Sequence, residues 1–211
     1  MVHDVRVFEN AGIPFEVLRD KIQKIEIKRG SFIYRTGDAP QGLYGVRSGL
    51  VGLVLAGPSG KDHFMRFFTS GQVFGHRTLI AEQTYHATTL ALETTVLDFL
   101  PKNDALKLLS EYPKLYQVIM KQLANELYHC ESQLVSILDQ HILPRIARAI
   151  VYLKEIHPSY RWTRSEIASF CASTTSTVIK ALAELEYMQL IKQKGRDIVI
   201  LDRQGLIHFT E

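Results

Sequence analysis

The sequence of 211 residues has little of what several classes of protein require. It holds two cysteines, Cys130 and Cys171, which lie far apart and form no CxxC pair. Structural zinc sites and iron–sulfur clusters draw on several closely spaced cysteines or histidines, so we expect neither within one chain. The eight histidines are scattered and contain no HExxH motif, so we predict no metal site.

Long apolar runs are also missing. No run approaches the roughly 18 apolar residues that a membrane-spanning helix needs, and residues 1–4 lack the charged and apolar regions of a signal peptide. We therefore expect a cytoplasmic protein without membrane contact. No nucleophile, base and orienting residue form a recognisable catalytic set, so we do not expect an enzyme.

Net charge is small, but it is unevenly distributed. The chain has 25 Lys and Arg residues against 22 Asp and Glu residues, a net charge of +3. Residues 142–211 hold ten of the bases and seven of the acids, so they carry the whole excess. A local basic excess favours a nucleic-acid partner, although an excess of this size has little weight by itself.

Turn residues, mostly glycines, divide the first hundred positions into short segments rich in aromatic and β-branched side chains. Such segments, spaced about 8–12 residues apart, are typical of a β-sandwich or barrel. Before them, Val5–Ile25 is predicted to hold one or two short helices. The expected strands are Ser31–Tyr34, Leu50–Leu55 and His63–Phe68, followed by a longer run, His86–Leu100, that closes at Pro101.

A helical pattern begins at Asn103, and Pro113 fits the first turn of a long helix. Apolar residues then alternate at spacings of three and four, which makes a seam of about two and a half heptads. The seam predicts that two copies of the helix pair across a dimer axis; the alternative is a core helix packed on its own domain. Pro144 is predicted to end or kink the helix and to mark a hinge. The seam residues are Met120, Leu123, Leu127, Cys130, Leu134 and Ile137.

The last third of the chain predicts a helix over Arg145–Ile156, then two helices within Thr163–Leu190 and a hairpin over Ile191–Leu201. Thr163 and Glu166 fit a capping box. The turn between the two helices falls on residues 172–174, and Thr174 fits the N-cap of the second helix. The hairpin is expected to turn at residues 194–197, beside basic side chains.

The second of these helices has two unlike faces. One face is apolar at spacings of three and four, and the other offers small polar side chains and a lysine near the N-terminus. Such a helix can dock in a major groove, although an ordinary amphipathic helix with a solvated face would share the pattern. The basic hairpin that follows favours DNA, because it resembles a wing placed against phosphates. The apolar face holds Val178, Ala181, Leu182 and Leu185; the other holds Thr175, Ser176, Ile179 and Lys180.

At this point the chain resembles the Crp–Fnr family of transcription regulators over nearly its whole length. In the first half, the resemblance rests on Gly37-Asp38, Tyr44–Val51 and Gly71–Gly75, which look like the glycine-punctuated roll of cyclic nucleotide-binding domains. In the second half, it rests on segments of the expected helix-turn-helix. These are Pro144–Ala147, Thr163–Ala168, Thr177-Val178, Leu182 and Leu185.

The resemblance implies an α+β fold in three parts. They are an effector-sensing β jelly roll over residues 1–110, a dimerisation helix over 111–141 and a winged-helix DNA-binding domain over 142–211. It also implies a homodimer on a pseudo-palindromic duplex, and it leaves RNA polymerase open as a partner. A different function remains open, in which the chain is a cyclic-nucleotide-like sensor or interaction module whose winged helix contacts protein.

By resemblance, Arg164, Thr174 and Thr177 would hold phosphates, and Thr175, Ser176 and Lys180 would take the three main base-reading positions. We also assign Ile179 to a thymine methyl group, and Lys194 and Arg196 to phosphates. Familiar members have Arg-Glu where this chain has Thr175-Ser176, and glycine where it has Ala172. Because Arg reads guanine strongly, its loss predicts a different operator, with more indirect readout or more weight on Lys180 and Ile179.

The family's nucleotide cassette also differs here. It begins Gly-Glu and ends Arg-Ser or Arg-Thr, whereas this chain has Gly75-His76 and then His86-Ala87. The positions that face adenine correspond to Cys130 and Glu131. Losing the charged partners of a phosphate weakens its binding, since such bonds contribute roughly 1.5–3 kcal/mol each. We therefore predict that cyclic AMP is not the physiological effector.

Another ligand is an open alternative for the roll. His76, Arg77 and His86 could meet an anion, and Thr88 offers a hydroxyl; equally, these side chains could face solvent or pack structurally. The oxygen-sensing branch carries an N-terminal cysteine cluster, which this chain lacks, so we expect no iron–sulfur cluster. Cys130 on the seam could make a redox or metal contact across the axis, or could serve as a small hydrophobe.

Overall fold

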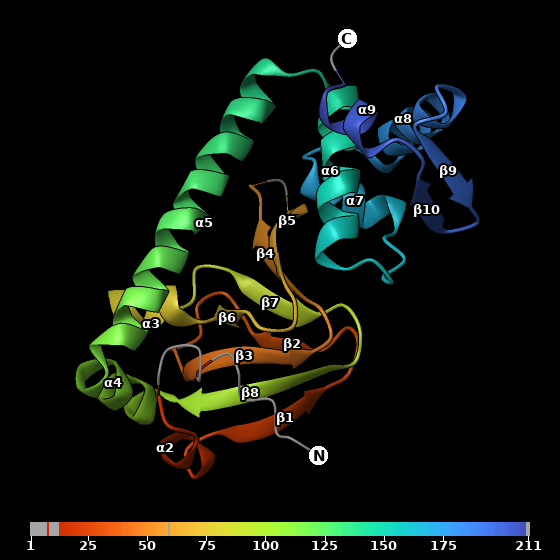
Figure 1. The fold of residues 1–211 in the computed structure, drawn as a ribbon. Coiled ribbons are helices and arrows are strands. Elements are labelled where there is room, and N and C mark those ends of the chain that lie inside the picture. Colours follow the sequence, from red (N-terminus) through yellow and green to blue (C-terminus); the bar gives the residue numbers. More distant parts are fainter. Residues whose placement is uncertain (1–7, 9–12, 59, 210–211) are drawn as a thin grey trace. The chain divides into compact units, whose positions relative to one another are not determined.

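A computed structural model describes residues 8, 13–58 and 60–209 (Figure 1). It divides into two compact units, Met1–Lys61 with Met65–Tyr128, and Asp62–Phe64 with His129–Glu211. The boundary between the units falls between Tyr128 and His129, inside the long helix. This division into two units does not test the predicted three-part boundaries. None of the helices in the described ranges is both long and apolar enough to cross a membrane.

The first unit is built on two four-stranded sheets, with strand orders β1–β8–β3–β6 and β2–β7–β4–β5. The α+β fold with a β roll is therefore confirmed. The predicted run His86–Leu100 is divided into β7 and β8, because the chain passes there from one sheet to the other. The strands are β1 (Gln23–Ile27), β2 (Phe32–Tyr34), β3 (Gly42–Ser48), β4 (Val51–Ala56), β5 (Asp62–Phe68), β6 (Val73–Phe74), β7 (Thr88–Ala91) and β8 (Thr95–Pro101).

Short helices pack against the roll around an apolar cluster of this unit. The predicted helical stretch Val5–Ile25 is correct for α2 (Phe15–Arg19), but β1 already begins at Gln23; its residues 5–7 and 9–12 lie outside the described part. The cluster joins α2, α4 (Lys102–Glu111) and the start of α5 (Pro113–Asp139). Its buried members include Leu18, Leu43, Leu79, Leu100, Leu108, Leu115 and Ile119.

Helix α3 (His76–Ala81) was not predicted, since six residues are too few to show a helical period. It begins after Gly75, whose φ of +87° lies in the left-handed region that favours glycine. A Cβ at this position would lie 2.8 Å from the carbonyl oxygen of Gly42, so the close approach also requires glycine. The helix therefore starts where the backbone of β3 leaves no room for a side chain.

The long helix α5 begins at Pro113 as predicted, but it ends at Asp139. Helix α6 (Ile142–Ile156) already contains Pro144 in its first turn, where a missing N–H removes no intrahelical bond. The prediction that Pro144 ends or kinks the long helix is therefore wrong. The break falls on residues 140–141, before the proline.

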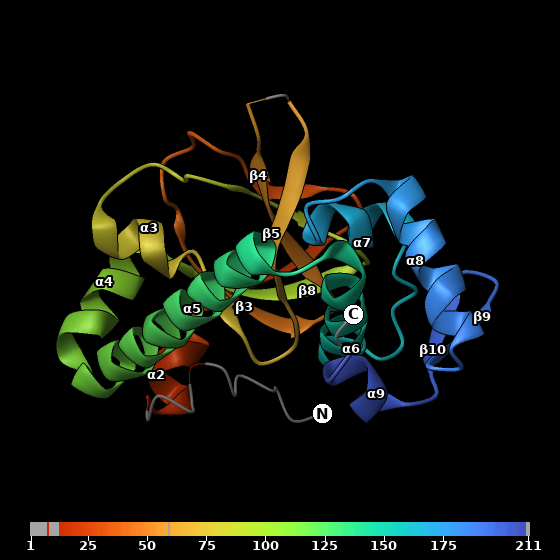
Figure 2. The ribbon, with the colours of Figure 1, turned by 90° about the horizontal axis from the view of Figure 1, so that it is seen from above.

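The second unit is a compact winged helix. Helix α8 lies between α7 and the β9–β10 hairpin in both views (Figures 1 and 2), and it packs on α6, α7 and β9. The apolar face predicted for α8 is buried, and Trp162 is buried in the same unit. The remaining elements are α7 (Arg164–Phe170), α8 (Thr175–Tyr187), β9 (Ile191–Lys194), β10 (Asp197–Ile200) and α9 (Arg203–Ile207).

The turn between α7 and α8 places a non-glycine residue in a left-handed conformation. Ala172 has a φ of 49°. The Ala172 N–H donates to the carbonyl of Ser169, and the Ser173 N–H donates to that of Ala168 at 2.8 Å. This pattern is a Schellman motif, which usually has glycine at the position of Ala172. The turn thus keeps its shape at the cost of a strained alanine.

We expect Ala172→Gly to stabilise the winged helix by about 0.5–1 kcal/mol, because glycine removes the left-handed strain while adding some freedom to the unfolded chain. Thermal unfolding of the full chain at fixed concentration measures the change. Ala183→Gly, on the exposed face of α8, is the matched control and should destabilise by about 1 kcal/mol. A lower unfolding temperature for Ala172→Gly would show that the turn carries no strain.

Candidate functional site

Helix α8 starts with the cap that the sequence predicts. Thr174 is the N-cap, and its Oγ1 accepts a hydrogen bond from the Thr177 N–H at 3.2 Å. The same oxygen lies 2.9 Å from Ser176 Oγ and 2.8 Å from Thr177 Oγ1. The predicted capping box of α7 is also present, with Thr163 and Glu166 bonded in both directions. Both helix starts are therefore fixed by local hydrogen bonds.

The side chains assigned to base reading gather at the start of α8. Thr175, Ser176 and Lys180 are exposed, and Ile179 is 55% exposed although it is a large hydrophobe. The buried face of the helix forces them outward, because Val178 and Leu182 fill the core beneath. Together they form a polar surface with one cation and one exposed aliphatic group, which suits a major groove.

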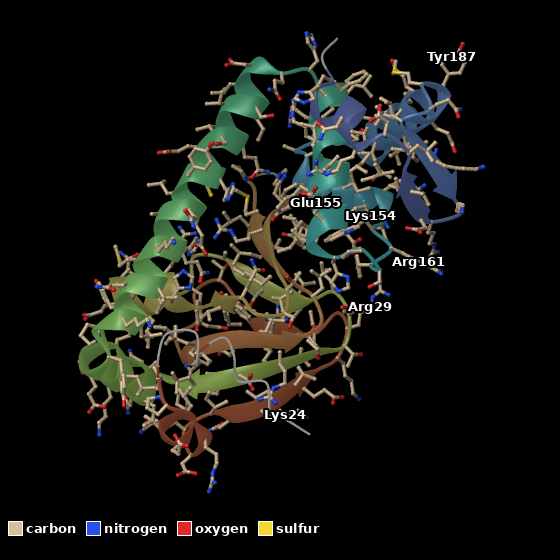
Figure 3. All side chains as sticks on the ribbon, in the orientation of Figure 1. Lys24, Arg29, Lys154, Glu155, Arg161 and Tyr187 are labelled. Atoms are coloured by element: carbon tan, nitrogen blue, oxygen red, sulfur yellow. The ribbon has the colours of Figure 1, made fainter. Side chains whose placement is uncertain are left out.

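The hairpin forms a two-residue turn at Gly195-Arg196, as predicted for residues 194–197. Gly195 has a φ of +61°, and the flanking Lys194 and Arg196 are exposed. An ion pair holds the turn end of the hairpin: Lys154 on α6 (Figure 3) places its Nζ 2.7 Å from Oδ1 of Asp197, the residue that follows the turn. The hydrogen bond from Lys154 is the largest cause of the lowered pKa of Asp197. The hairpin thus presents two cations beside α8.

Arg164, assigned to phosphate by resemblance, is half-buried and contacts the hairpin. Its Nη1 donates to the carbonyl of Arg196 at 2.7 Å, and its Nη2 donates to Gln193 Oε1 at 2.6 Å. Gln193 in turn donates to Glu186 at the far end of α8. Gln193, Glu186 and the Lys154–Asp197 pair were not predicted from the sequence. No local pattern indicates contacts between segments that lie apart in the chain.

The first half of the cassette is buried rather than open. His76, which the resemblance aligns with the family's glutamate, is 2% exposed. Its Nε2 lies 3.6 Å from Glu126 Oε2, and neither ring nitrogen has a hydrogen-bond partner among the described residues. Arg66 Nη1 lies 2.5 Å from the same carboxylate oxygen, and Gln122 donates to the other at 2.8 Å. These groups join β5 and α3 to α5.

Burial would raise the pKa of Glu126, but its neighbours outweigh burial. Contacts with His76 and Arg66, and the hydrogen bond from Gln122, lower the pKa of Glu126 to about 2. The carboxylate is therefore charged at neutral pH. It is a partner for cations of the protein itself.

Aromatic side chains fill the interior of the roll near the second half of the cassette. Tyr85, directly before His86, is 1% exposed and stacks on Tyr34 with ring centroids 3.6 Å apart. Tyr44 and Phe74 stack beside them at 5.2 Å. Burial raises the pKa of Tyr34, Tyr44 and Tyr85, so their phenols are neutral. The interior of the roll next to His86 is thus lined by neutral aromatic rings.

The other cassette residues lie in different surroundings. Arg77 and His86 are exposed, Thr88 is half-buried and Ala87 is buried. Burial and then the nearby charge of Arg77 lower the pKa of His86, so the imidazole lies near the Arg77 guanidinium and its neutral form is favoured. Thr88 Oγ1 accepts a hydrogen bond from the Thr36 N–H at 3.1 Å. Their binding of an effector stays a prediction.

The heptad seam is largely exposed in a single chain. Leu127 is 60% exposed and Leu134 is 56% exposed, and Met120, Ile137 and Cys130 are exposed too. Leu123 alone of the seam is packed against the core cluster of the first unit. Glu131, the second residue assigned to adenine, is also exposed. An apolar stripe of this length favours a covering partner over a helix packed wholly on its own domain.

Two family models match the chain, and together they span most of it. The model described as the cyclic nucleotide-binding domain matches residues 24–112. The model described as the Crp-like helix-turn-helix domain matches residues 144–209. The first contains the roll and its cassette, and the second contains α7, α8 and the hairpin.

Relatives match along the chain at low identity. "Electron transport regulator A" of Shewanella oneidensis is 25% identical over 92% of this chain and 84% of its own length. The "CRP-like cAMP-activated global transcriptional regulator" of Mycobacterium tuberculosis is 23% identical, covering 90% of this chain and 88% of that protein.

Solved structures share the fold. FixK2 from Bradyrhizobium japonicum has a TM-score of 0.79 at 20% identity, over 88% of this chain and 95% of that one. The c-di-GMP responsive global regulator CLP of Xanthomonas campestris has a TM-score of 0.78 at 18% identity, over 88% and 96% of the two chains.

The lowered pKa of Glu126 gives an expected pH dependence. A depressed carboxylate pKa stabilises the fold fully above about pH 4.5, and this stability is lost as the pH falls toward 2. The contribution is on the order of 3 kcal/mol. We expect Glu126→Gln to lower the free energy of unfolding at pH 7 and to flatten its decline between pH 5 and 2. Denaturant unfolding at fixed protein concentration measures both.

The matched control is Glu131→Gln, which changes an exposed carboxylate on the same helix. It should leave the pH profile as in the parent chain. A profile for Glu126→Gln as steep as the parent's would show that Glu126 has no stabilising ion pair.

Proposed function

We propose that this chain, which belongs to the Crp–Fnr family of DNA-binding transcription regulators, acts as a cytoplasmic homodimer that reads a pseudo-palindromic operator and responds to an effector other than cyclic AMP. The observation that carries the DNA-reading part is the surface of the second unit. There, the exposed start of α8 and the two cations of the hairpin lie in one folded unit.

In this proposal the start of α8 enters the major groove. Lys180 and Ile179 contact base edges, and the hydroxyls of Thr175 and Ser176 bond to bases or phosphates. Thr174, Thr177, Arg164, Lys194 and Arg196 contact the backbone. Because no arginine stands at the reading positions, part of the specificity comes from DNA shape.

Dimerisation rests on the exposed stripe of α5. A second copy of the chain that covers Leu127 and Leu134 would remove this apolar surface from water and place a second winged helix on the duplex. Two such units read half-sites whose centres lie about one helical turn apart, roughly 34 Å. An effector in the roll would reorient them through the break between α5 and α6. RNA polymerase is the protein partner we propose for the DNA-bound dimer.

Mobility shifts on genomic fragments, at several salt concentrations, test the DNA-reading surface. We expect Lys180→Ala to weaken specific binding by about 1–3 kcal/mol. We expect Lys194→Ala to weaken binding to all sequences and to reduce the salt slope by about one. Lys24→Ala, on β1 of the other unit (Figure 3), is the matched control and should bind as the parent does.

Unchanged affinity in both Lys180→Ala and Lys194→Ala would refute the assignment. A parent chain that shifts no fragment at any salt concentration would favour the protein-contacting winged helix.

A cyclic nucleotide does not fit the residues of this roll. The glutamate that would take the ribose is replaced by a buried histidine beside Glu126. The methyl of Ala87 stands in place of a hydroxyl, and the neutral rings of Tyr85 and Tyr34 occupy the interior. The relatives show that one fold serves different signals, since one is named for cyclic AMP and one structure for c-di-GMP. The exposed guanidinium of Arg77, beside the His86 imidazole, favours an anionic effector here.

Calorimetry at pH 7 measures the interaction with cyclic AMP. We expect no binding at micromolar concentrations, because losing three polar partners of about 1.5–3 kcal/mol each weakens affinity by several orders of magnitude. The M. tuberculosis relative is the positive control, since it is named as cAMP-activated. A low-micromolar dissociation constant for this chain would overturn the proposal.

A further inference from the structure

A chain of hydrogen bonds joins the end of α8 to the hairpin and to the start of α7. Glu186 receives two of them from one residue: Gln193 N donates to its Oε1 at 2.7 Å, and Gln193 Nε2 donates to its Oε2 at 2.9 Å. Gln193 Oε1 then accepts from Arg164 Nη2 at 2.6 Å. Arg164 also donates to the hairpin turn: its Nη1 donates to the carbonyl of Arg196 at 2.7 Å, and its Nη2 donates to the carbonyl of Gly195 at 3.4 Å.

Both polar atoms of the Gln193 side-chain amide take part in these hydrogen bonds. Its NH₂ group faces the carboxylate and its oxygen faces the guanidinium, so the side chain has one orientation that satisfies both charged neighbours. The bonds from Gln193 are the largest causes of the lowered pKa of Glu186. Glu186 is therefore charged when the network forms. The hairpin is then tied to α8 at its first strand and to α7 at its turn.

A two-stranded hairpin is marginally stable by itself, so its position depends on what holds it. The strands of this one are held by the buried Ile191 and Ile198, and the Lys154–Asp197 pair holds the start of the second strand, next to the turn. Its turn, which carries Lys194 and Arg196, extends beyond that core and is held by Arg164 (Figure 2 shows the hairpin beside α8). Fixing the turn in advance lowers the ordering cost of placing two cations on phosphates.

We propose that Glu186 and Gln193 are positioning residues for DNA binding, which hold the hairpin turn at a set distance from α8 through Arg164. The proposal rests on the DNA-reading function above. Arg164 has five N–H groups, and three hydrogen bonds go to the hairpin, so it retains donors for a phosphate. In this proposal the acidic residue Glu186 supports a surface that binds DNA, although DNA is itself negatively charged.

The direction in which DNA affinity changes when Glu186 is removed separates this positioning role from a purely electrostatic effect. Removing a negative charge near bound DNA should strengthen binding, because the charge repels phosphates. If Glu186 holds the hairpin, its removal should instead weaken binding. Glu184 supplies the matched control: it is exposed on the same helix, and its carboxylate has no hydrogen bond or ion pair within the described part of the chain.

The experiment measures duplex binding by the full chain, at several salt concentrations, for Glu186→Ala, Gln193→Ala and Glu184→Ala. We expect Glu186→Ala and Gln193→Ala to bind about three- to tenfold more weakly, with a reduced salt slope. Glu184→Ala should bind equally or up to about twofold more tightly. Thermal unfolding of each variant confirms that it is folded; if Glu186→Ala is not, Gln193→Ala carries the test.

A double-mutant cycle shows whether the effect passes through the hairpin. In a background with both Lys194→Ala and Arg196→Ala, Glu186→Ala should weaken binding no further, because the cations that it positions are gone. An equal loss in that background, or tighter binding by Glu186→Ala in the parent chain, would overturn the positioning role while leaving the DNA-reading function intact. If the background itself binds DNA like the parent, the hairpin assignment fails, and the positioning role fails with it.

Discussion

Burial of one face of α8 is the constraint on which the DNA-reading surface depends. Val178, Ala181, Leu182 and Leu185 are all buried, and they lock the rotation of the helix against α6, α7 and β9. With that rotation fixed, the helical period determines which side chains face solvent, and Ile179 and Lys180 are among them. Truncating a buried leucine of this kind costs about 2–5 kcal/mol, far more than a change on the outer face.

What the sequence could predict was local. The capping box at Thr163, the N-cap at Thr174 and the turn at Gly195 all follow from neighbouring residues, and the structure confirms them. Strands β2, β4 and β5 were found by the same logic, since turn chemistry and alternation act over a few positions, whereas β1 and β3 were not among the predicted strands. The resemblance to the family then supplied the arrangement that local patterns could not.

The features that escaped prediction depend on contacts between distant segments. The role of Pro144 was mispredicted because a proline suits the first turn of a helix as well as the end of one. The break between α5 and α6 at residues 140–141, before the proline, decides between them. Tyr85 gives no local sign that it will stack on Tyr34, 51 positions away. The link from Glu186 through Gln193 to Arg164 joins three elements, so no single window of sequence contains it.

Both units differ from the family pattern at positions that the resemblance assigns to recognition. In the roll, neutral rings fill the interior next to His86, and Glu126 is paired with side chains of the protein itself. In the winged helix, hydroxyls stand where a guanine-reading arginine is familiar.

The most direct test of the DNA-reading surface is selection of duplexes from a random pool by the full chain, followed by sequencing. We predict enrichment of an inverted repeat whose half-site centres lie about 10–10.5 base pairs apart. Within each half-site we predict a preference at the positions next to Lys180 and Ile179, which Lys180→Ala relaxes. A pool that stays random after repeated selection, or a single unrepeated half-site, would contradict a homodimer that reads DNA through α8.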